Sequence, residues 1–353
     1  MGYTITSHNP AEFTDDEIAV GCAFRNAMSA EILPDEPPTP VDVAITSNRS
    51  VPPRMRRRSF RAWAADGTMV GGLAAAIDRE HDDNPDVLPC DVSVLPDHRR
   101  QGVGTALLAE YIAFARSEGR TRFIGGTTGS VPAGAAFAEA MGAESKSAQH
   151  MNHLPTAEVD RPLMQRWVDE GPARAPDYEL MMWDGAIPEQ YLADFVDLAA
   201  VMNDAPRDAM ELNDFTLTAE QLREQESQME AVGYEHWTVV ARRVSDGALA
   251  GFHDVMWSPH DPGSIYVGST GVRREHRGHA LGRWLKAAVT LRVLDERPDC
   301  TDIRTANADS NDAMLGINKQ MGYRPLIAST AWEIAVEDAA SWVKSKGVDI
   351  PAS

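Results

Sequence analysis

The chain repeats one pattern of turns and helices at a constant offset, and this repeat restricts its fold more than any other feature. Asp-Gly turns at Gly67 and Gly247 each lie between two apolar runs, which predicts two hairpins of the same kind. Met-Gly pairs at Gly142 and Gly322 end helical stretches at the same distance beyond those turns. The two glycines of each pair are 180 residues apart, so the sequence divides into two similar halves.

A chain of 353 residues is too long to fold around one small hydrophobic core, and two domains of roughly 150 residues are expected. Residues 159–176 carry prolines and charges around one short amphipathic stretch, which is typical of a linker. We therefore expect an N-terminal domain at 1–158, this linker, and a C-terminal domain at 177–353. Strands, helices and a hairpin follow in the same order in each half, which predicts an α/β (α+β) fold layered around a sheet.

The charge and cysteine content exclude several classes of protein. Lys and Arg number 33 against 53 Asp and Glu, and the net charge of −20 argues against a nucleic-acid surface and favours cationic ligands. The alternative is an ordinary acidic, soluble surface. Three widely spaced cysteines indicate neither a disulfide framework nor a zinc site, which fits a cytoplasmic protein. No apolar run approaches the roughly 20 residues that a membrane span requires.

A basic segment with small residues joins a strand to a helix in each half. "HRRQGVGTALL" at 98–108 follows the strand-like "CDVSVL", and "HRGHALGRWLK" at 276–286 follows "IYVGSTGV". Small residues at such a corner let backbone N–H groups approach an anion, which the helix dipole also favours. The segment is no Walker loop and lacks the third glycine of a dinucleotide fingerprint. A pyrophosphate is the expected ligand.

The strand, corner and helix together resemble the GNAT superfamily of acyl-CoA-dependent N-acyltransferases. "VSVLPDHRRQGVG" matches the family pattern of a V-x-V strand followed by [QR]-x-x-G-x-[GA]. "TGVRREHRGHALG" matches with Thr270 in place of the first valine and Ala280 in place of the first glycine. The order across the chain resembles the tandem GNAT proteins of actinobacteria, the group that includes mycothiol synthase. The resemblance implies two GNAT folds, each a mixed, mostly antiparallel sheet flanked by helices.

The same resemblance implies that acetyl-CoA binds at both corners. The strand segments 92–94 and 270–272 would pair with the pantetheine amides, the corners would hold the pyrophosphate, and an asparagine near the start of the following helix would approach CoA. The implied cofactor-binding residues are Val92, Val94, Arg99, Arg100, Gln101, Gly102, Val103, Gly104, Thr105, Thr270, Val272, Arg277, Gly278, His279, Ala280, Gly282, Arg283, Asn307 and Asn311.

Proton-transfer groups are expected in the second half only. Many GNAT enzymes carry Glu or His six residues before the second strand valine, and Tyr four residues before the final motif glycine. The first half has Leu88 and Ala138 there, whereas the second has Tyr266 and Asn318. His253, on the preceding strand, suits a proton acceptor at neutral pH. Tyr266, His253 and Asn318 are the candidate catalytic residues; structural roles are the alternative for His253 and Tyr266. Other polar residues expected near this site are Asp254, Ser269 and Asp204.

The asparagine-containing segment 305–323 has no counterpart in the first half, which reads "GGTTGSVPAGAAFAEAMGA". We therefore expect both halves to bind acyl-CoA and the C-terminal half to carry the transfer. The expected reaction is acetyl transfer from acetyl-CoA to a primary amine of a small molecule, such as an aminosugar, amino acid or antibiotic-like compound. A non-catalytic acyl-CoA-binding or regulatory protein is the alternative. No metal, nucleic acid or membrane partner is expected, and the protein would be a monomer or homodimer.

Overall fold

The computed structural model describes residues 2–352, which form two compact units that are discontinuous in sequence. Unit 1 contains residues 2–148, 209–213 and 328–352, and unit 2 contains residues 149–208 and 214–327. This division differs from the contiguous one expected from the sequence, because each unit takes in a strand from the opposite half of the chain. None of the described helices is both long and apolar enough to cross a bilayer.

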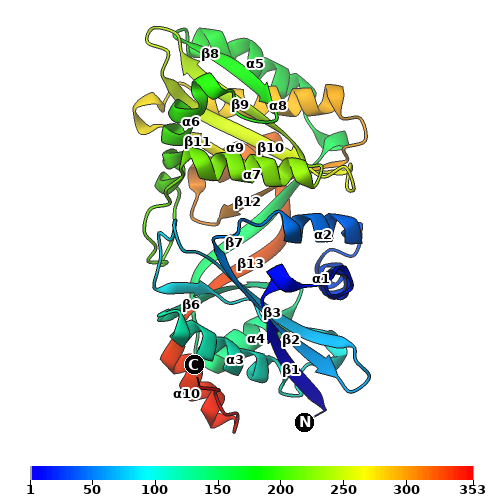
Figure 1. Cartoon of the computed structure of the whole chain (residues 1–353). Helices are drawn as coiled ribbons and strands as arrows, with labels where there is room; N and C mark the ends of the chain where they lie inside the picture. The colour runs from blue at the N-terminus through cyan, green and yellow to red at the C-terminus, as the bar shows by residue number, and fades with distance from the viewer. Residues whose placement is uncertain (1, 353) are drawn as a thin grey trace. The chain divides into compact units, whose positions relative to one another are not determined.

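Unit 1 is an open sheet covered by helices (Figure 1). Strands β1, β2, β3 and β5 form an antiparallel sheet in that order, and β4, β6 and β13 form a second group in which β4 and β6 are parallel. The elements are β1 Tyr3–His8, α1 Asp15–Ile32, α2 Val41–Arg49, β2 Met55–Ala64, β3 Met69–Asp78, β4 Val87–Pro89, β5 Ser93–Val94, α3 Val103–Ser117, β6 Arg122–Thr128, α4 Pro132–Met141, most of β13 Arg324–Ala335, and α10 Val336–Ser345.

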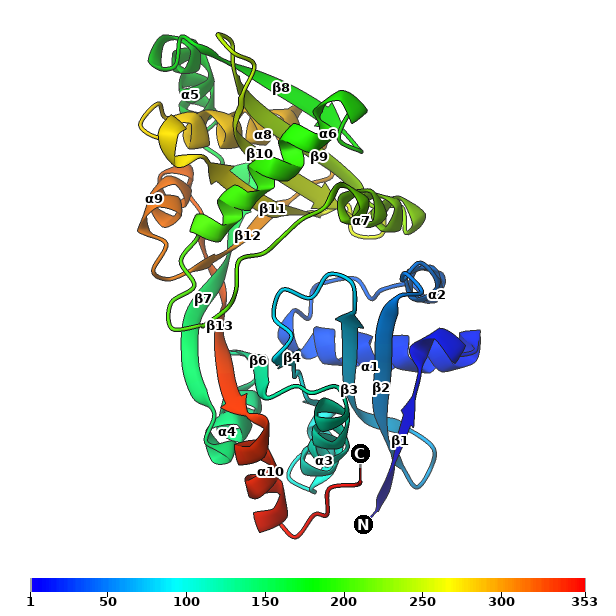
Figure 2. The same ribbon diagram turned by 60° about the vertical axis from the view of Figure 1, so that its left-hand side comes forward.

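Helices α1 and α3 cover opposite faces of the unit 1 sheet (Figure 2). Neighbouring glycines of β3 show this, since successive residues of a strand face opposite sides. Gly71 lies against Val103 of α3, and Gly72 lies against Phe24 of α1. The core between the sheet and α3 is built from Leu107, Tyr111 and other buried side chains.

Unit 2 has the same order of elements around one sheet. Its strands run in the order β7, β12, β11, β10, β9 and β8, and every pair except β11 with β12 is antiparallel. The mixed, mostly antiparallel sheet flanked by helices is therefore confirmed. The elements are β7 Glu144–Pro155 (from residue 149), α5 Arg161–Arg174, β8 Tyr178–Asp184, α6 Leu192–Ala199, α7 Ala219–Ala231, β9 Glu235–Arg243, β10 Leu249–Trp257, β11 Ser264–Val272, α8 Leu281–Glu296, β12 Asp302–Ala308 and α9 Asp312–Met321.

The segment expected as a linker is a helix that belongs to unit 2. The Asp160 carboxylate caps α5 by accepting a hydrogen bond from the Leu163 N–H at 2.9 Å. Met164 is completely buried, and Gly171 lies so close to the ring of Trp284 on α8 that a Cβ there would be 2.4 Å from ring atoms. The prolines and charges of this stretch thus mark a packed helix, with its apolar stripe buried against α8.

The last strand of each half completes the sheet of the other unit. β13, drawn in orange-red in Figure 2, pairs with β6 in unit 1, whereas β7 pairs with β12 in unit 2. The registers correspond, since Glu333 lies opposite Ile124 and His153 lies opposite Arg304. Glu333 forms an ion pair with Arg122 at 3.1 Å in unit 1. The two strands therefore exchange places at equivalent positions.

Candidate functional site

The strand-to-helix corner has the same backbone in both units although its glycines differ. Arg100 and Gly102 have φ values of 60° and 85°, and Gly278 and Ala280 have values of 88° and 58°. A left-handed conformation costs a residue with a side chain roughly 1–2 kcal/mol, so the geometry is kept at a cost at Arg100 and Ala280. No side chain caps α3 or α8, which leaves their first N–H groups without a side-chain acceptor. N–H groups of this kind suit an anionic ligand.

The corner arginines brace the strands. The Arg99 Nε donates to the Val94 carbonyl at 2.9 Å, and its guanidinium bonds Glu31 of α1 at 2.7 Å. Arg277 repeats this with the Val272 carbonyl at 3.0 Å and Asp204 at 2.8 Å. The hydrogen bonds from Arg99 lower the pKa of Glu31, so this pair stays ionised. Both guanidinium groups are therefore engaged before any ligand arrives.

A cavity of about 580 Å³ opens in unit 1 beside the corner. It exists because β4 pairs with β6 while β5 pairs only with β3, so the sheet separates after Cys90. Residues 92–94 form one wall, and residues 125–128 of β6 form the other. Residues of α1, the corner, α3, α4, β13 and α10 complete the lining. Pockets of roughly 300–1,000 Å³ are typical for small-molecule ligands.

The sheet of unit 2 opens at the same place, but the cavity there has a volume of only about 140 Å³. β11 pairs with β12 through residues 264–266 and then diverges. Thr270, Asn307 and Asn311 line the small pocket together with Ser269 and Met202 and further residues of the same segments. The opening of the sheet is thus shared by the two units, while the space inside it is not.

Larger side chains fill the opening in unit 2. The two halves align with an offset of 178 residues through α3 and α8 and of 180 residues from β6 and β12 onward. At five positions that line the unit 1 cavity, unit 2 carries a bulkier or more polar side chain: Leu108, Gly125, Gly134, Ala138 and Ala143 correspond to Lys286, Thr305, Met314, Asn318 and Tyr323. Of the five in unit 2, Lys286, Thr305, Asn318 and Tyr323 are buried.

Comparison with known proteins identifies this fold. Residues 27–143, all in unit 1, match the model of the Acetyltransferase (GNAT) family. A tandem GNAT protein from the clavulanic acid biosynthesis pathway, solved without AcCoA, is 27% identical with a TM-score of 0.75, and the match covers 95% of this chain and 98% of that one. Residues 27–143 therefore belong to the GNAT acetyltransferase family, and the whole chain is similar to a tandem GNAT protein.

Two further comparisons concern the fold and the curated proteins. A GCN5-related N-acetyltransferase from Sphaerobacter thermophilus has a TM-score of 0.62 at 13% identity over 94% of this chain and 96% of that chain, which shows a shared fold. No curated protein matches the chain. The family match and the tandem GNAT neighbour support an acyltransferase.

The cofactor residues implied by the sequence divide unequally between the two cavities of this chain. Nearly all of those in unit 1 line the large cavity: Val92, Val94, Arg99, Arg100, Gly102, Val103, Gly104 and Thr105. Gln101 does not, since its side chain donates to the Asp97 carbonyl at 2.8 Å. In unit 2 only Thr270, Asn307 and Asn311 line the small pocket. The remaining ones lie outside that lining: Val272, Arg277, Gly278, His279, Ala280, Gly282 and Arg283.

His253 is buried inside unit 2. Its side chain is 2% exposed, and its Nδ1 lies 2.8 Å from the Thr270 hydroxyl. Burial, together with the nearby charge of Lys286, holds the pKa of His253 well below its usual value. The imidazole is therefore neutral and does not line the pocket.

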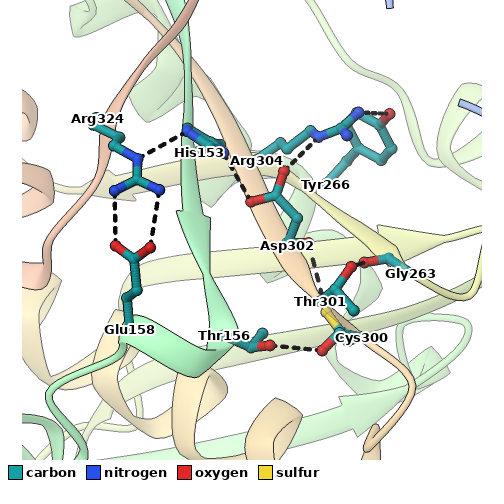
Figure 3. Close-up of polar contacts among 10 residues, drawn as sticks. All are labelled: His153, Thr156, Glu158, Gly263, Tyr266, Cys300, Thr301, Asp302, Arg304 and Arg324. Carbon is teal, nitrogen blue, oxygen red and sulfur yellow. Dashed lines mark hydrogen bonds and ion pairs between the residues drawn. The ribbon is translucent and has the colours of Figure 1, made fainter. Parts of the chain in front are cut away.

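Tyr266 and Asn318 are also held in internal contacts. Arg304 donates a hydrogen bond to the Tyr266 hydroxyl at 2.9 Å and also bonds Asp302 (Figure 3). Asp302 continues this polar chain to His153 of β7 at 3.2 Å. Asn318 is 2% exposed and donates to the Asn307 side chain at 2.7 Å. Neither Tyr266 nor Asn318 lines the pocket, so the three candidate catalytic residues do not meet in one open site.

Asp91 is a residue that the sequence interpretation missed. Its Oδ1 accepts a hydrogen bond from the Gly126 N–H at 2.9 Å, at the point where β5 and β6 separate. Cys90 and Val92 both line the cavity, so the intervening exposed side chain projects to the other face of the segment. The aspartate could have been noticed in "CDVSVL", where it precedes the two valines, but its position at the opening depends on the break between β4 and β5.

Asp254 of β10 bonds Ser269, the residue of unit 2 that corresponds to Asp91. The Oδ1 of Asp254 accepts from the Ser269 N–H at 2.8 Å, beside a register shift between β10 and β11. Protein surrounds the carboxyl group although the residue keeps some exposed surface, and this burial raises its pKa to about 7.

Among residues 2–352 no group of three or more His, Cys, Asp or Glu side chains is placed to hold a metal ion.

Proposed function

We propose that the protein is an acyl-CoA-dependent N-acyltransferase that binds its cofactor in the unit 1 cavity. The observation that carries this proposal is the contrast between about 580 Å³ in unit 1 and about 140 Å³ in unit 2, behind the same opening of the sheet. The family match at residues 27–143 lies in the same unit and supports the choice. Acetyl-CoA is the proposed donor, and a primary amine of a small molecule is the proposed acceptor.

Each part of the cavity suits one part of this cofactor. The corner offers the uncapped N–H groups of α3 to the pyrophosphate. The edge of β5 that faces β6 offers backbone groups to the pantetheine amides. When bound, acyl-CoA supplies an activated thioester. The protein therefore has to hold an amine near the thioester in an orientation that allows attack. The net charge of −20 favours the approach of a cationic acceptor.

Asp91 is the proposed proton acceptor and amine-binding group. Leu88 is completely buried and Ala138 has no ionisable group, so the usual positions cannot serve. The exposed Asp91 carboxylate is fixed by the Gly126 N–H where the strands separate. We propose that it holds the acceptor nitrogen at the opening, on the face opposite the cofactor cavity, and takes the proton that the nitrogen releases as the C–N bond forms. The C–S bond breaks in the same reaction, and CoA leaves as its thiolate, which takes a proton from water.

This proposal assigns the transfer to the opposite half from the one the sequence favoured. That expectation rested on the asparagine-containing segment 305–323, whose Asn307 and Asn318 side chains bond each other. The Arg283 guanidinium lies 5.3 Å from the ring centroid of Trp167, so it is also stacked within unit 2. We propose that unit 2 is a scaffold without a cofactor site of its own.

A matched pair of substitutions tests the assignment. Gly104→Trp fills the large cavity, and Gly282→Trp makes the same change at the corresponding position of unit 2. Titration calorimetry should find one CoA per wild-type chain, no binding to Gly104→Trp and normal binding to Gly282→Trp. Release of CoA with polyamines and aminosugars should follow the same pattern. Loss of CoA binding and turnover with Gly282→Trp alone would show that the transfer takes place in unit 2. Binding of CoA without turnover of any amine would favour the regulatory alternative.

A further inference from the structure

Helix α10 forms a wall of the unit 1 cavity. It packs against α3 and α4, and the ring of its Trp342 lies edge-on to Phe137 of α4, with centroids 5.4 Å apart at 87°. Trp342 and Lys346 both line the cavity that contains the corner residues Arg99 and Arg100. A segment from the end of the chain therefore contributes to the same space as the corner.

Two of the cations that line this cavity have no acidic partner. The guanidinium of Arg99 is taken by Glu31. In contrast, among residues 2–352 no carboxylate lies within ion-pair distance of Arg100 or Lys346, although Asp and Glu outnumber Lys and Arg in this chain by 53 to 33. The Lys346 ammonium lies 5.3 Å from the ring centroid of Trp342, an attractive cation–π distance. Positive charge is thus left uncompensated at two places around one cavity.

These two places call for a ligand with two separate anionic groups. Arg100 belongs to the corner, where the N–H groups of α3 already suit a pyrophosphate. Lys346 follows the last turn of α10, on a different wall. At the corresponding corner of unit 2, Gly278 stands in place of Arg100, and the neighbouring Arg274 and Arg277 both bond Asp204.

We propose that Lys346, held against Trp342, binds the 3′-phosphate of the CoA nucleotide and so makes unit 1 selective for 3′-phosphorylated CoA. The inference rests on the proposed function, since it requires CoA to occupy the unit 1 cavity. It assigns to α10 a recognition role that is separate from the pyrophosphate corner.

The experiment compares CoA with 3′-dephospho-CoA, which differ only in that phosphate. Titration calorimetry on the full chain should show that the wild type binds CoA about five- to tenfold more tightly, a difference that falls as NaCl is raised. Lys346→Ala should weaken CoA binding by that factor and leave dephospho-CoA binding unchanged. Lys346→Arg should retain most of the preference, since it keeps the charge. Lys344→Ala, on the same helix but outside the cavity lining, is the matched control.

The alternative outcomes are distinct. Equal affinity of the wild type for both ligands, or equal weakening of both by Lys346→Ala, overturns the role of Lys346 while leaving the unit 1 site in place. Absence of binding of either ligand to the wild type overturns the proposed function, and the inference with it. Thermal unfolding of each variant shows that a change in affinity is not a loss of folded protein.

Discussion

Leu108 and Lys286 lie at corresponding positions of α3 and α8, yet Leu108 lines the large cavity and Lys286 is enclosed in the core of unit 2. The lysine side chain is 1% exposed, and its Nζ has no hydrogen-bond partner among the described residues. Its ammonium lies 5.4 Å from the ring centroid of Tyr323. Burial lowers the pKa of Lys286 to about 8. The residue that helps to close unit 2 therefore costs it stability at neutral pH.

Lys286→Leu, which installs the residue of unit 1, should stabilise unit 2 at pH 7. The pKa of Lys286 in the folded protein lies below the ordinary value of 10.5, so the penalty is complete below pH 8 and disappears as the pH rises toward 10.5. The gain at pH 7 should be at most about 3 kcal/mol and should shrink at pH 10. Chemical denaturation at the two pH values measures it, and a variant that is destabilised at both would contradict the interpretation.

Asp254→Asn should also stabilise unit 2, with the opposite dependence on pH. The raised pKa of about 7 means that folding favours the protonated acid, so the penalty grows from about pH 4 to pH 7 and is constant above. The asparagine oxygen can still accept from the Ser269 N–H. We expect a gain of at most about 4 kcal/mol at pH 8 and little change at pH 4.5. Equal effects at both pH values would rule out titration of this group as the cause.

Ala143→Tyr should close the unit 1 cavity, because it places there the residue that fills unit 2. Ala143 lines the cavity, whereas the corresponding Tyr323 is buried. CoA affinity should fall at least about 100-fold, equivalent to roughly 3 kcal/mol. Ala143→Ser is the control that keeps the volume small. Undiminished CoA binding by a folded Ala143→Tyr protein would place the cofactor elsewhere.

Asp91→Asn should lower turnover without weakening CoA binding. The amide keeps an oxygen for the Gly126 N–H but cannot accept the proton or attract an ammonium group. A decrease of about 100-fold in kcat/KM for the amine is expected from the loss of one proton-transfer group. Asp97→Asn, an exposed acid in the next turn, is the matched control. Steady-state kinetics with the best amine of the panel decides, and a variant with wild-type rates would remove Asp91 from the mechanism.

The repeat and its motifs predicted the fold because both are local. Gly67, Gly247 and the corner segments each fix a short piece of backbone, and the same order of elements in two halves implies two similar sheets. The exchange of β7 and β13 could not be predicted in this way. Either strand suits either sheet by its alternation, and contacts such as Arg122 with Glu333 and Asp302 with His153 become visible only in three dimensions.

The candidate site was predicted only in part for a related reason. Residue spacing indicated the corner residues of unit 1, and the structure places most of them around one cavity. Spacing does not reveal burial, so His253 and Asn318 gave the same signal as open catalytic residues. The alignment of the halves does show Ala143 against Tyr323, but the resulting loss of volume depends on several side chains that fill one opening together.

The exchanged strands have a consequence for the gene as well as for the protein. A fragment ending at residue 158 would retain β6 without β13, and the complementary fragment would retain β12 without β7. Either piece would leave a bare sheet edge, which is prone to aggregation. Substitutions can thus change the binding site of either copy one residue at a time, but deletion of the C-terminal copy would remove a structural part of unit 1.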